Sequence, residues 1–283
     1  MANGSATVGL LHPGEMGVTV GASAVAGGAR VLWASEGRSA ETRARALEAK
    51  LEDGGSLAAV VRASGVILSV VPPHGALDLA RTVAGLGFRG LYVDGNAVAP
   101  ETSREIGRLV EGAGGRFVDG GIIGPAARKR GTTRLYLSGA GASEAAELFS
   151  AGPIDAVVLD GPAGAASAVK MAYAAWTKGS SALLAAVRAF AIAEEVDAAL
   201  LSEWKISQPD VPARSERAFT DNARKAWRFV GEMEEIARSL AGAGLPAGFH
   251  EAAGEIYERL AVYKDTRTPP TVEEAAGKVR RRA

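Results

Sequence analysis

The first 160 residues or so alternate between short runs rich in Val, Ile and Leu and longer segments with helical periodicity. The apolar runs, each typical of a strand, cover residues 7–11, 30–34, 66–71, 91–94, 116–119, 135–138 and 157–159. The run at 66–71 (VILSVV) is almost wholly apolar, as expected of a strand covered on both faces. With helices expected at 14–26, 40–51, 74–84, 100–110 and 143–150, the alternation predicts a Rossmann-like, doubly wound, mostly parallel α/β sheet.

From residue 164 onward the pattern changes, and no convincing strand follows. Residues 165–193 form an apolar stretch with three charged side chains, and residues 216–240 repeat apolar positions at steps of three and four, as one amphipathic helix does. A further helix is expected to end near residue 264, before a charged tail. We therefore predict a dinucleotide-binding domain over residues 1–162 and an all-α substrate and dimerisation domain over residues 163–283.

Composition narrows the classes of function. Lys and Arg together number 32, as do Asp and Glu, so no global field gathers nucleic acid or an anionic membrane, and a small molecule is the expected partner. Cysteine is absent, which excludes thiolate zinc sites and a cysteine nucleophile, and three scattered histidines predict no metal site. The apolar runs are broken by charges and glycines, and no signal peptide is evident, so a cytoplasmic protein is expected.

The segment GLLHPGEMG, residues 9–17, lies between the first strand and the first helix. A dinucleotide-binding turn needs glycines there, so that the backbone approaches the pyrophosphate at the helix N-terminus. Gly14 and Gly17 take the second and third glycine positions, but His12 stands at the first, Pro13 lacks an N–H and Glu15 is acidic. An ordinary βα turn is the alternative. The cofactor contacts expected in this segment are His12, Pro13, Gly14, Glu15 and Met16.

The end of the second strand bears on the choice of cofactor. An NAD site usually has an acidic residue there for the ribose hydroxyls, whereas Arg38 between Ser35 and Ser39 suits a 2′-phosphate. NADP is therefore predicted, although Glu36 keeps NAD possible, and a loop without a ligand is a further alternative. The remaining expected cofactor contacts follow later strands: Val71, Pro72 and Asn96.

Three further segments resemble motifs of one known family. Residues 94–100 read DGNAVAP, residues 119–125 read DGGIIGP, and residues 161–173 read GPAGAASAVKMAY. With GEMG at 14–17 they resemble, in order, the four motifs of the β-hydroxyacid dehydrogenases and of the cofactor domain of 6-phosphogluconate dehydrogenase. Asn96 stands at the first hydroxyl position of D-x-S-T-x-x-P, and Ile123 replaces the serine of the substrate loop. By this resemblance, the chain retains the family's lysine as Lys170 and has Tyr173 in place of the family's asparagine.

The helical half is similar to one branch of that family. Residues 166–179, 200–209 and 228–237 resemble a C-terminal domain of unassigned function, joined to phosphogluconate-dehydrogenase-like cofactor domains. The resemblance spans about residues 5–265. It implies an oxidoreductase that moves hydride between NADP and a small hydroxy acid, oxo acid or related carbonyl compound. Imine reduction on the same scaffold, and a non-catalytic NADP-binding regulatory protein, remain the alternatives.

Three residues are the candidates for chemistry. Lys170 lies one to two turns into the apolar helix, where a charged amine incurs a desolvation cost that suits it to proton transfer, so it is the predicted general acid/base. Asn96 follows a strand's carboxyl end and is expected to orient the substrate or the ribose, with capping as its alternative. Tyr173, three residues after Lys170, is a candidate for the proton relay, and core packing is equally consistent with its position.

The apolar stretch also predicts self-association. As a helix, residues 165–193 measure about 43 Å at 1.5 Å per residue and are apolar on nearly every face. One small cofactor domain leaves much of that surface uncovered, and the family that the chain resembles pairs such helices between subunits. A homodimer through the C-terminal helices is therefore expected.

Overall fold

A computed structural model describes residues 6–280 of the chain, which divides into two compact units. The first unit is Met1–Met171 and the second is Ala172–Ala283. The division falls inside the longest helix, α7 (Ala165–Ala193), whose first two turns belong to the first unit.

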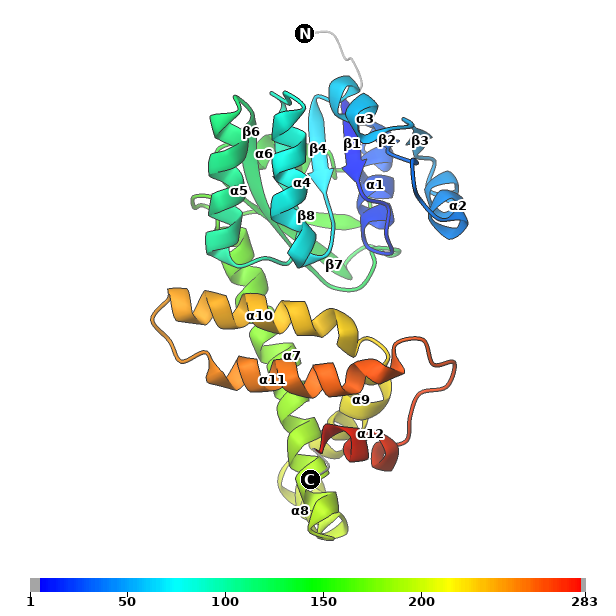
Figure 1. Cartoon of the computed structure of the whole chain (residues 1–283), viewed down its shortest axis with the longest axis vertical. Coiled ribbons are helices and arrows are strands. Elements are labelled where there is room, and N and C mark those ends of the chain that lie inside the picture. The colour runs from blue at the N-terminus through cyan, green and yellow to red at the C-terminus, as the bar shows by residue number, and fades with distance from the viewer. Residues whose placement is uncertain (1–5, 281–283) are drawn as a thin grey trace. The chain divides into compact units, whose positions relative to one another are not determined.

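The first unit is built on an eight-stranded sheet with the order β3-β2-β1-β4-β5-β6-β7-β8 (Figure 1). The strands are β1 (Thr7–Leu11), β2 (Arg30–Trp33), β3 (Glu52–Asp53), β4 (Val66–Ser69), β5 (Leu91–Asp94), β6 (Arg116–Ile123), β7 (Thr133–Ser138) and β8 (Ile154–Val158). Every neighbouring pair is parallel except β6 with β7. The predicted Rossmann-like α/β fold is confirmed. The chain leaves β1 in one direction to β2 and returns past it to β4, so the carboxyl ends of β1 and β4 mark the switch point where such sheets bind ligands.

Helices cover both faces of the sheet. They are α1 (Gly17–Ala26), α2 (Ala40–Glu48), α3 (Leu57–Ala63), α4 (Pro73–Gly85), α5 (Pro100–Gly112) and α6 (Ala142–Glu147). Successive side chains of a strand point to opposite faces, and in β4 both sets are buried: Val66 and Leu68 pack with α1 and α6, while Ile67 packs with α3, α4 and α5. This double burial explains why the strands appear in the sequence as continuous apolar runs.

Two details of the first unit differ from the predictions. Strand β6 continues to Ile123 and pairs with β7, so residues 120–123 are strand and not a loop. Gly120 and Gly121 lack the apolar side chains that define a strand in the sequence, which is why the prediction ended at residue 119. The short elements β3 and α3 were missed because β3 has two exposed residues and α3 only seven residues.

The second unit is helical throughout its described residues, as predicted. After α7 come α8 (Asp197–Ser207), α9 (Val211–Ala223), α10 (Ala226–Gly242), α11 (Gly248–Leu260), a 3₁₀ turn (Ala261–Tyr263) and α12 (Val272–Val279). The predicted single helix over residues 216–240 is wrong, because the chain breaks at Arg224 and Lys225. Both helices bury one apolar stripe, and the two-residue break keeps the spacing of three and four across it. The predicted tail is also wrong in part: Thr271 and Glu274 form a capping box that starts α12.

No helix within residues 6–280 is long and apolar enough to cross a membrane, α7 included.

Candidate functional site

The turn between β1 and α1 contains two glycines, and at one of them a side chain could not be accommodated. A Cβ on Gly17 would lie 2.0 Å from the carbonyl oxygen of His12, so only glycine fits where the helix leaves the strand. A Cβ on Gly14 would meet nothing within 4 Å, so the turn has an open face at that position. The first turn of α1 carries no acidic residue. The open face at Gly14 leaves room for a phosphate group near the N-terminus of this ten-residue helix.

His12 and Arg38 are brought together by this turn and the loop after β2. Nη2 of Arg38 lies 2.7 Å from Nε2 and 3.1 Å from Nδ1 of the imidazole. Burial first, and Arg38 second, lower the pKa of His12 to about 4, so the ring is uncharged near neutral pH and accepts a hydrogen bond from the guanidinium. Two of the sequence-predicted cofactor residues thus form one contact, 26 residues apart in the chain.

The other predicted residues of the β2–α2 loop shape the loop itself. The Ser35 side chain is buried, and its carbonyl oxygen accepts a hydrogen bond from Nη2 of Arg43 at 2.8 Å. Ser39 is the N-cap of α2 and accepts from the backbone N–H of Thr42. Arg43 escaped the sequence interpretation because it lies within the expected helix and not in the loop.

Asn96 is 2% exposed, and its amide is engaged within the protein. Its Oδ1 accepts from the backbone N–H of Val71 at 2.6 Å, and its Nδ2 donates to the Ser69 hydroxyl at 3.0 Å and to Asp94. These bonds join the carboxyl end of β5 to the loop after β4, which leads through Pro72 into α4. The geometry supports a role in fixing the position of Val71 and Pro72.

A second buried acid lies beside Asp94. The register pairs Asp94 of β5 with Asp119 of β6. Burial first, and the neighbouring Asp119 second, raise the pKa of Asp94 to about 7. Oδ2 of Asp94 and the hydroxyl of Tyr92, two residues earlier, are both buried without a hydrogen-bond partner among the described residues. A neutral, protonated Asp94 is therefore the form that this packing favours below pH 7.

Asp119 holds the start of α7. Its Oδ1 accepts from the hydroxyls of Ser103 at 2.8 Å and Ser167 at 2.5 Å. Its Oδ2 accepts from the Ser138 hydroxyl at 3.0 Å and from the backbone N–H groups of Gly164 and Ser167, both at 2.9 Å. These two backbone donors lie at the beginning of α7, where helical N–H groups lack partners within the helix. Asp119 is thus a buried cap that bonds α7 to the sheet.

Lys170 lies where α7 packs against β6. A Cβ on Gly121 would lie 2.6 Å from the Ala166 carbonyl oxygen and 3.0 Å from the Cβ of Lys170. The helix therefore lies directly on the strand because residue 121 has no side chain. The Lys170 side chain is half-buried. Tyr173 belongs to the second unit and is 49% exposed.

The sequence interpretation missed the serines that surround Asp119. Ser103, Ser138 and Ser167 lie 16 to 48 residues from Asp119, so no local pattern groups them. The resemblance placed Asp119 at the start of a substrate loop, whereas the carboxylate is fully buried. Ile123, at the family's serine position, is also buried. No group of three or more potential metal ligands occurs within residues 6–280.

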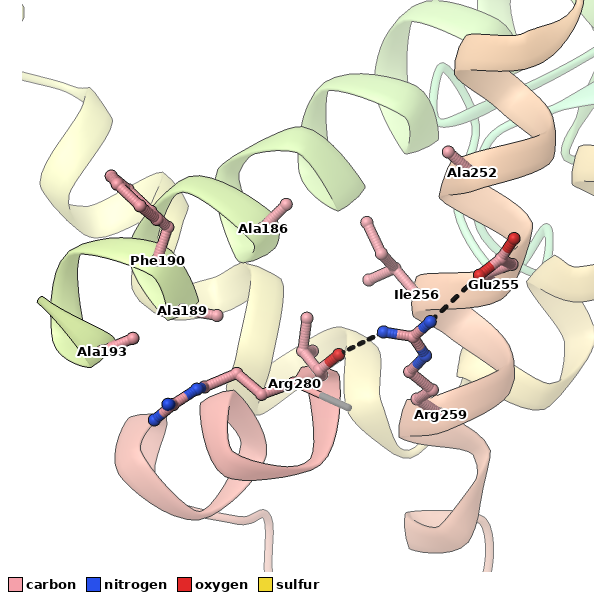
Figure 2. Close-up of a pocket in the computed structure, with 10 residues that line it drawn as sticks. Ala186, Ala189, Phe190, Ala193, Ala252, Glu255, Ile256, Arg259 and Arg280 are labelled. Atoms are coloured by element: carbon pink, nitrogen blue, oxygen red, sulfur yellow. Dashed lines mark hydrogen bonds and ion pairs between the residues drawn. The ribbon is translucent and has the colours of Figure 1, made fainter. Parts of the chain in front are cut away.

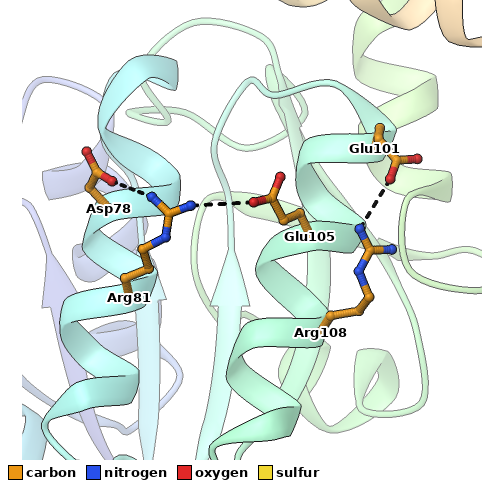
Figure 3. A network of polar contacts seen from close by, with 5 residues as sticks. All are labelled: Asp78, Arg81, Glu101, Glu105 and Arg108. Atoms are coloured by element: carbon orange, nitrogen blue, oxygen red, sulfur yellow. Dashed lines mark hydrogen bonds and ion pairs between the residues drawn. The ribbon is translucent and has the colours of Figure 1, made fainter.

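A surface network on α4 and α5 of the first unit is not part of this site (Figure 3). Arg81 lies 2.8 Å from Asp78 and 3.5 Å from Glu105, and Arg108 lies 3.2 Å from Glu101. All five side chains are about half exposed or more. Exposed pairs contribute at most about 1 kcal/mol each, so the network is a solvated helix surface.

The second unit contains a pocket of about 420 Å³, walled by α7, α11 and the end of α12 (Figure 2). Its walls are mostly apolar, with Ala186, Ala189, Phe190 and Ile256 among them. Arg259 in the wall donates to Glu255 and to the Val279 carbonyl oxygen. None of the predicted site residues line this pocket.

Two comparisons with known proteins match part of the chain. Residues 191–260 match the family model described as a domain of unknown function, DUF1932. An uncharacterized 28.5 kDa protein of Methanothermus fervidus is 34% identical over 138 residues, which cover 48% of this chain and 51% of that protein. The chain thus matches about half the length of that relative.

Solved structures align over nearly the whole chain. A conserved protein of unknown function, described as structurally similar to 3-hydroxyacid dehydrogenases, is 29% identical, with a TM-score of 0.68 over 91% of this chain and 99% of its own. The 3-hydroxyisobutyrate dehydrogenase of Mycobacterium tuberculosis is 16% identical, with a TM-score of 0.68 over 98% and 100%. The chain has the fold of the 3-hydroxyacid dehydrogenases. The resemblance found in its motifs, including the helical C-terminal domain, is confirmed.

Solved structures of reductive aminases align as well. A reductive aminase from Aspergillus terreus, in complex with NADPH and ethyl levulinate, is 16% identical, with a TM-score of 0.53 over 98% of this chain and 100% of its own. At these identities the likeness concerns the fold, and the residues of the site carry the argument about chemistry.

Proposed function

We propose that the chain is an NADP-dependent oxidoreductase that transfers hydride between the nicotinamide and a small hydroxy or oxo acid, or a related carbonyl compound. Lys170 is the general acid/base of this reaction. The fold is that of 3-hydroxyisobutyrate dehydrogenase and of an NADPH-bound reductive aminase, which supports the class of reaction.

One observation carries the role of Lys170. The first turns of α7 are fixed to the first unit by Asp119 at the helix start and by the bare backbone of Gly121 beneath Lys170. The lysine is therefore presented at the sheet that contains the candidate cofactor turn. Reduction of a carbonyl requires a proton at oxygen as hydride reaches carbon, and a positioned lysine in its ammonium form supplies it and becomes a neutral amine.

The residues of the first unit fit the cofactor. The turn at Gly14 and Gly17 suits the pyrophosphate, Arg38 suits a 2′-phosphate, and Val71 and Pro72 border the neighbouring strand end. The cofactor, when bound, supplies or accepts the hydride. The protein's part is to hold it and to move a proton at the nitrogen of Lys170.

The test combines a substrate panel with a lysine variant. The intact chain is assayed with NADPH and NADP⁺ against hydroxy acids, oxo acids, other carbonyl compounds and cyclic imines, following the absorbance of the reduced nicotinamide. Lys170→Met is expected to lower turnover by about 10²- to 10⁴-fold and to leave NADPH affinity within about twofold. Lys205→Met, an exposed lysine on α8, is the control. Undiminished turnover of Lys170→Met contradicts the assignment, and turnover of imines alone favours an imine reductase.

A non-catalytic NADP-binding protein is the second candidate. The observation in its favour is that the amide of Asn96 is occupied by Val71, Ser69 and Asp94, where the motif has a hydroxyl residue. Ile123 adds to it, because its buried apolar side chain replaces a serine. Tight NADPH binding without turnover of any substrate class supports this candidate.

We also propose that the protein is a homodimer that pairs through α7. In the second unit Tyr173, Trp176, Leu183 and Phe190 are between 48% and 68% exposed. They follow one another at steps of three or seven residues, which is the heptad spacing of a helix that packs along a second helix. Leu183 lies seven residues from both Trp176 and Phe190. An antiparallel pair centred on Leu183 therefore places Trp176 of each copy opposite Phe190 of the other.

A further inference from the structure

The contact between His12 and Arg38 has a chemical character that the dinucleotide motif lacks. A glycine at position 12 has no side chain to offer, whereas here an imidazole nitrogen lies 2.7 Å from Nη2 of Arg38. The two residues follow the ends of β1 and β2, neighbouring parallel strands. Both strand ends belong to the edge of the sheet where ligands of open α/β folds bind.

Arg38 keeps its whole charge in this arrangement. Within residues 6–280 it makes no ion pair, and the exposed Glu36 of the same loop forms neither a hydrogen bond nor an ion pair with it. Arg43, the next arginine along the chain, is used differently: it donates to the Ser35 carbonyl oxygen and lies 3.8 Å from Asp53. Of these two arginines, Arg38 is the one held by an uncharged group.

A neutral acceptor orients a guanidinium without neutralising it. His12 is uncharged near neutral pH because burial and the adjacent Arg38 both lower its pKa. A carboxylate in its place would fix the direction of Arg38 but cancel the charge, and a glycine would leave the long side chain free to rotate. An arginine that is oriented and still cationic is suited to an anionic ligand.

We propose that His12 is a positioning residue that holds Arg38 for the 2′-phosphate of the cofactor, and that this pair sets the preference for NADP over NAD. This inference rests on the proposed function. The guanidinium has donors on three nitrogens, and His12 contacts only Nη2. The other N–H group of Nη2 and the N–H group next to it, on Nη1 or Nε, remain for a forked pair of hydrogen bonds to a phosphate monoester.

The test measures nucleotide selectivity and not turnover. The intact chain is titrated calorimetrically near neutral pH with NADPH, NADH, adenosine 2′,5′-bisphosphate and adenosine 5′-monophosphate. His12→Phe keeps a ring but loses the acceptor, and we expect it to lower the preference for the 2′-phosphorylated ligands by about 5- to 10-fold. His12→Gln keeps a neutral acceptor and is expected to retain the preference within about twofold. In an Arg38→Met background, His12→Phe is expected to change the preference no further.

Each other outcome counts against the inference in an identifiable way. A His12→Phe variant with unchanged selectivity shows that the imidazole does not position Arg38. Equal losses for phosphorylated and unphosphorylated ligands show a merely structural role, and additive effects in the double variant show that the two residues act independently. If the unsubstituted chain binds none of the four ligands, the proposed function falls together with the inference, whereas binding with unchanged selectivity in His12→Phe removes the inference alone.

Discussion

Removing the Asp119 carboxylate tests whether the start of α7 is bonded to the sheet as described. In Asp119→Ala the backbone N–H groups of Gly164 and Ser167 lose their acceptor in a buried place. Three serine hydroxyls lose the same partner, but they can rotate toward other acceptors or an entering water, and the N–H groups cannot.

The expected cost follows from the two backbone donors. A buried donor left without an acceptor costs about 1–3 kcal/mol, so the pair costs about 2–6 kcal/mol, from which an entering water returns a part. We expect Asp119→Ala to lower the free energy of unfolding by about 3 kcal/mol. Asp119→Asn is expected to cost less, because its amide oxygen can still face the two N–H groups while its NH₂ group faces hydroxyls that can accept.

Urea unfolding followed by circular dichroism measures the free energy, and hydrogen exchange locates the change. The amide protons of Gly164 and Ser167 are expected to lose protection in Asp119→Ala and to keep most of it in Asp119→Asn. Asp155→Ala is the matched control, because this aspartate is exposed on β8, and it is expected to change stability by less than about 0.5 kcal/mol. Unaltered stability of Asp119→Ala, or protected amides at the two positions, would refute the role of Asp119 as the cap of α7.

Two further predictions follow from the packing. The pKa of Asp94 is raised from 3.8 to about 7, so the folded state binds this proton more tightly than the unfolded state does. The resulting contribution to the free energy of unfolding is fully present below about pH 4 and is lost as the pH rises to 7. Asp94→Asn carries no ionisable group at this position and should not show that loss. In urea titrations, the free energy of unfolding of the unsubstituted chain minus that of Asp94→Asn should therefore fall by a few kcal/mol between pH 4 and 7. A constant difference would contradict the raised pKa. For the dimer, Leu183→Glu is expected to yield a monomer at micromolar concentration in light scattering, with Glu216→Ala, an exposed position on α9, as the control; a natural chain that is itself monomeric removes the proposal.

The sequence predicts the architecture of the first unit because its strands are covered on both faces. A run such as VILSVV at 66–71 indicates a strand that is buried on both faces. The alternation of such runs with helical segments predicts the Rossmann-like sheet. Glycine hides the end of β6, where Gly120 and Gly121 lie against the backbone of β5 and α7 and carry no apolar signal. Periodicity likewise fails at residues 224 and 225, because two helices that bury one stripe keep its spacing across a short break.

The candidate site was predictable where a motif has local spacing and unpredictable where the fold joins distant residues. Gly14, Gly17 and Lys170 became candidates because each has a fixed place in a motif. The bond between His12 and Arg38, and the serines around Asp119, depend on neighbouring strands and so have no pattern along the chain. The same holds for Asn96: its place after β5 was predicted, but its engagement by the loop after β4 is a property of the folded sheet.

A crystal structure of the chain with NADP⁺ tests the proposed cofactor site most directly. We expect the dinucleotide over the β1–α1 turn, with its pyrophosphate at Gly14, its 2′-phosphate against Arg38 with His12 still in contact, and the nicotinamide facing the amine of Lys170. Clear density for the dinucleotide elsewhere on the chain, or a crystal that shows no nucleotide at concentrations far above the about 1 μM to 1 mM at which enzymes engage their substrates, would contradict it.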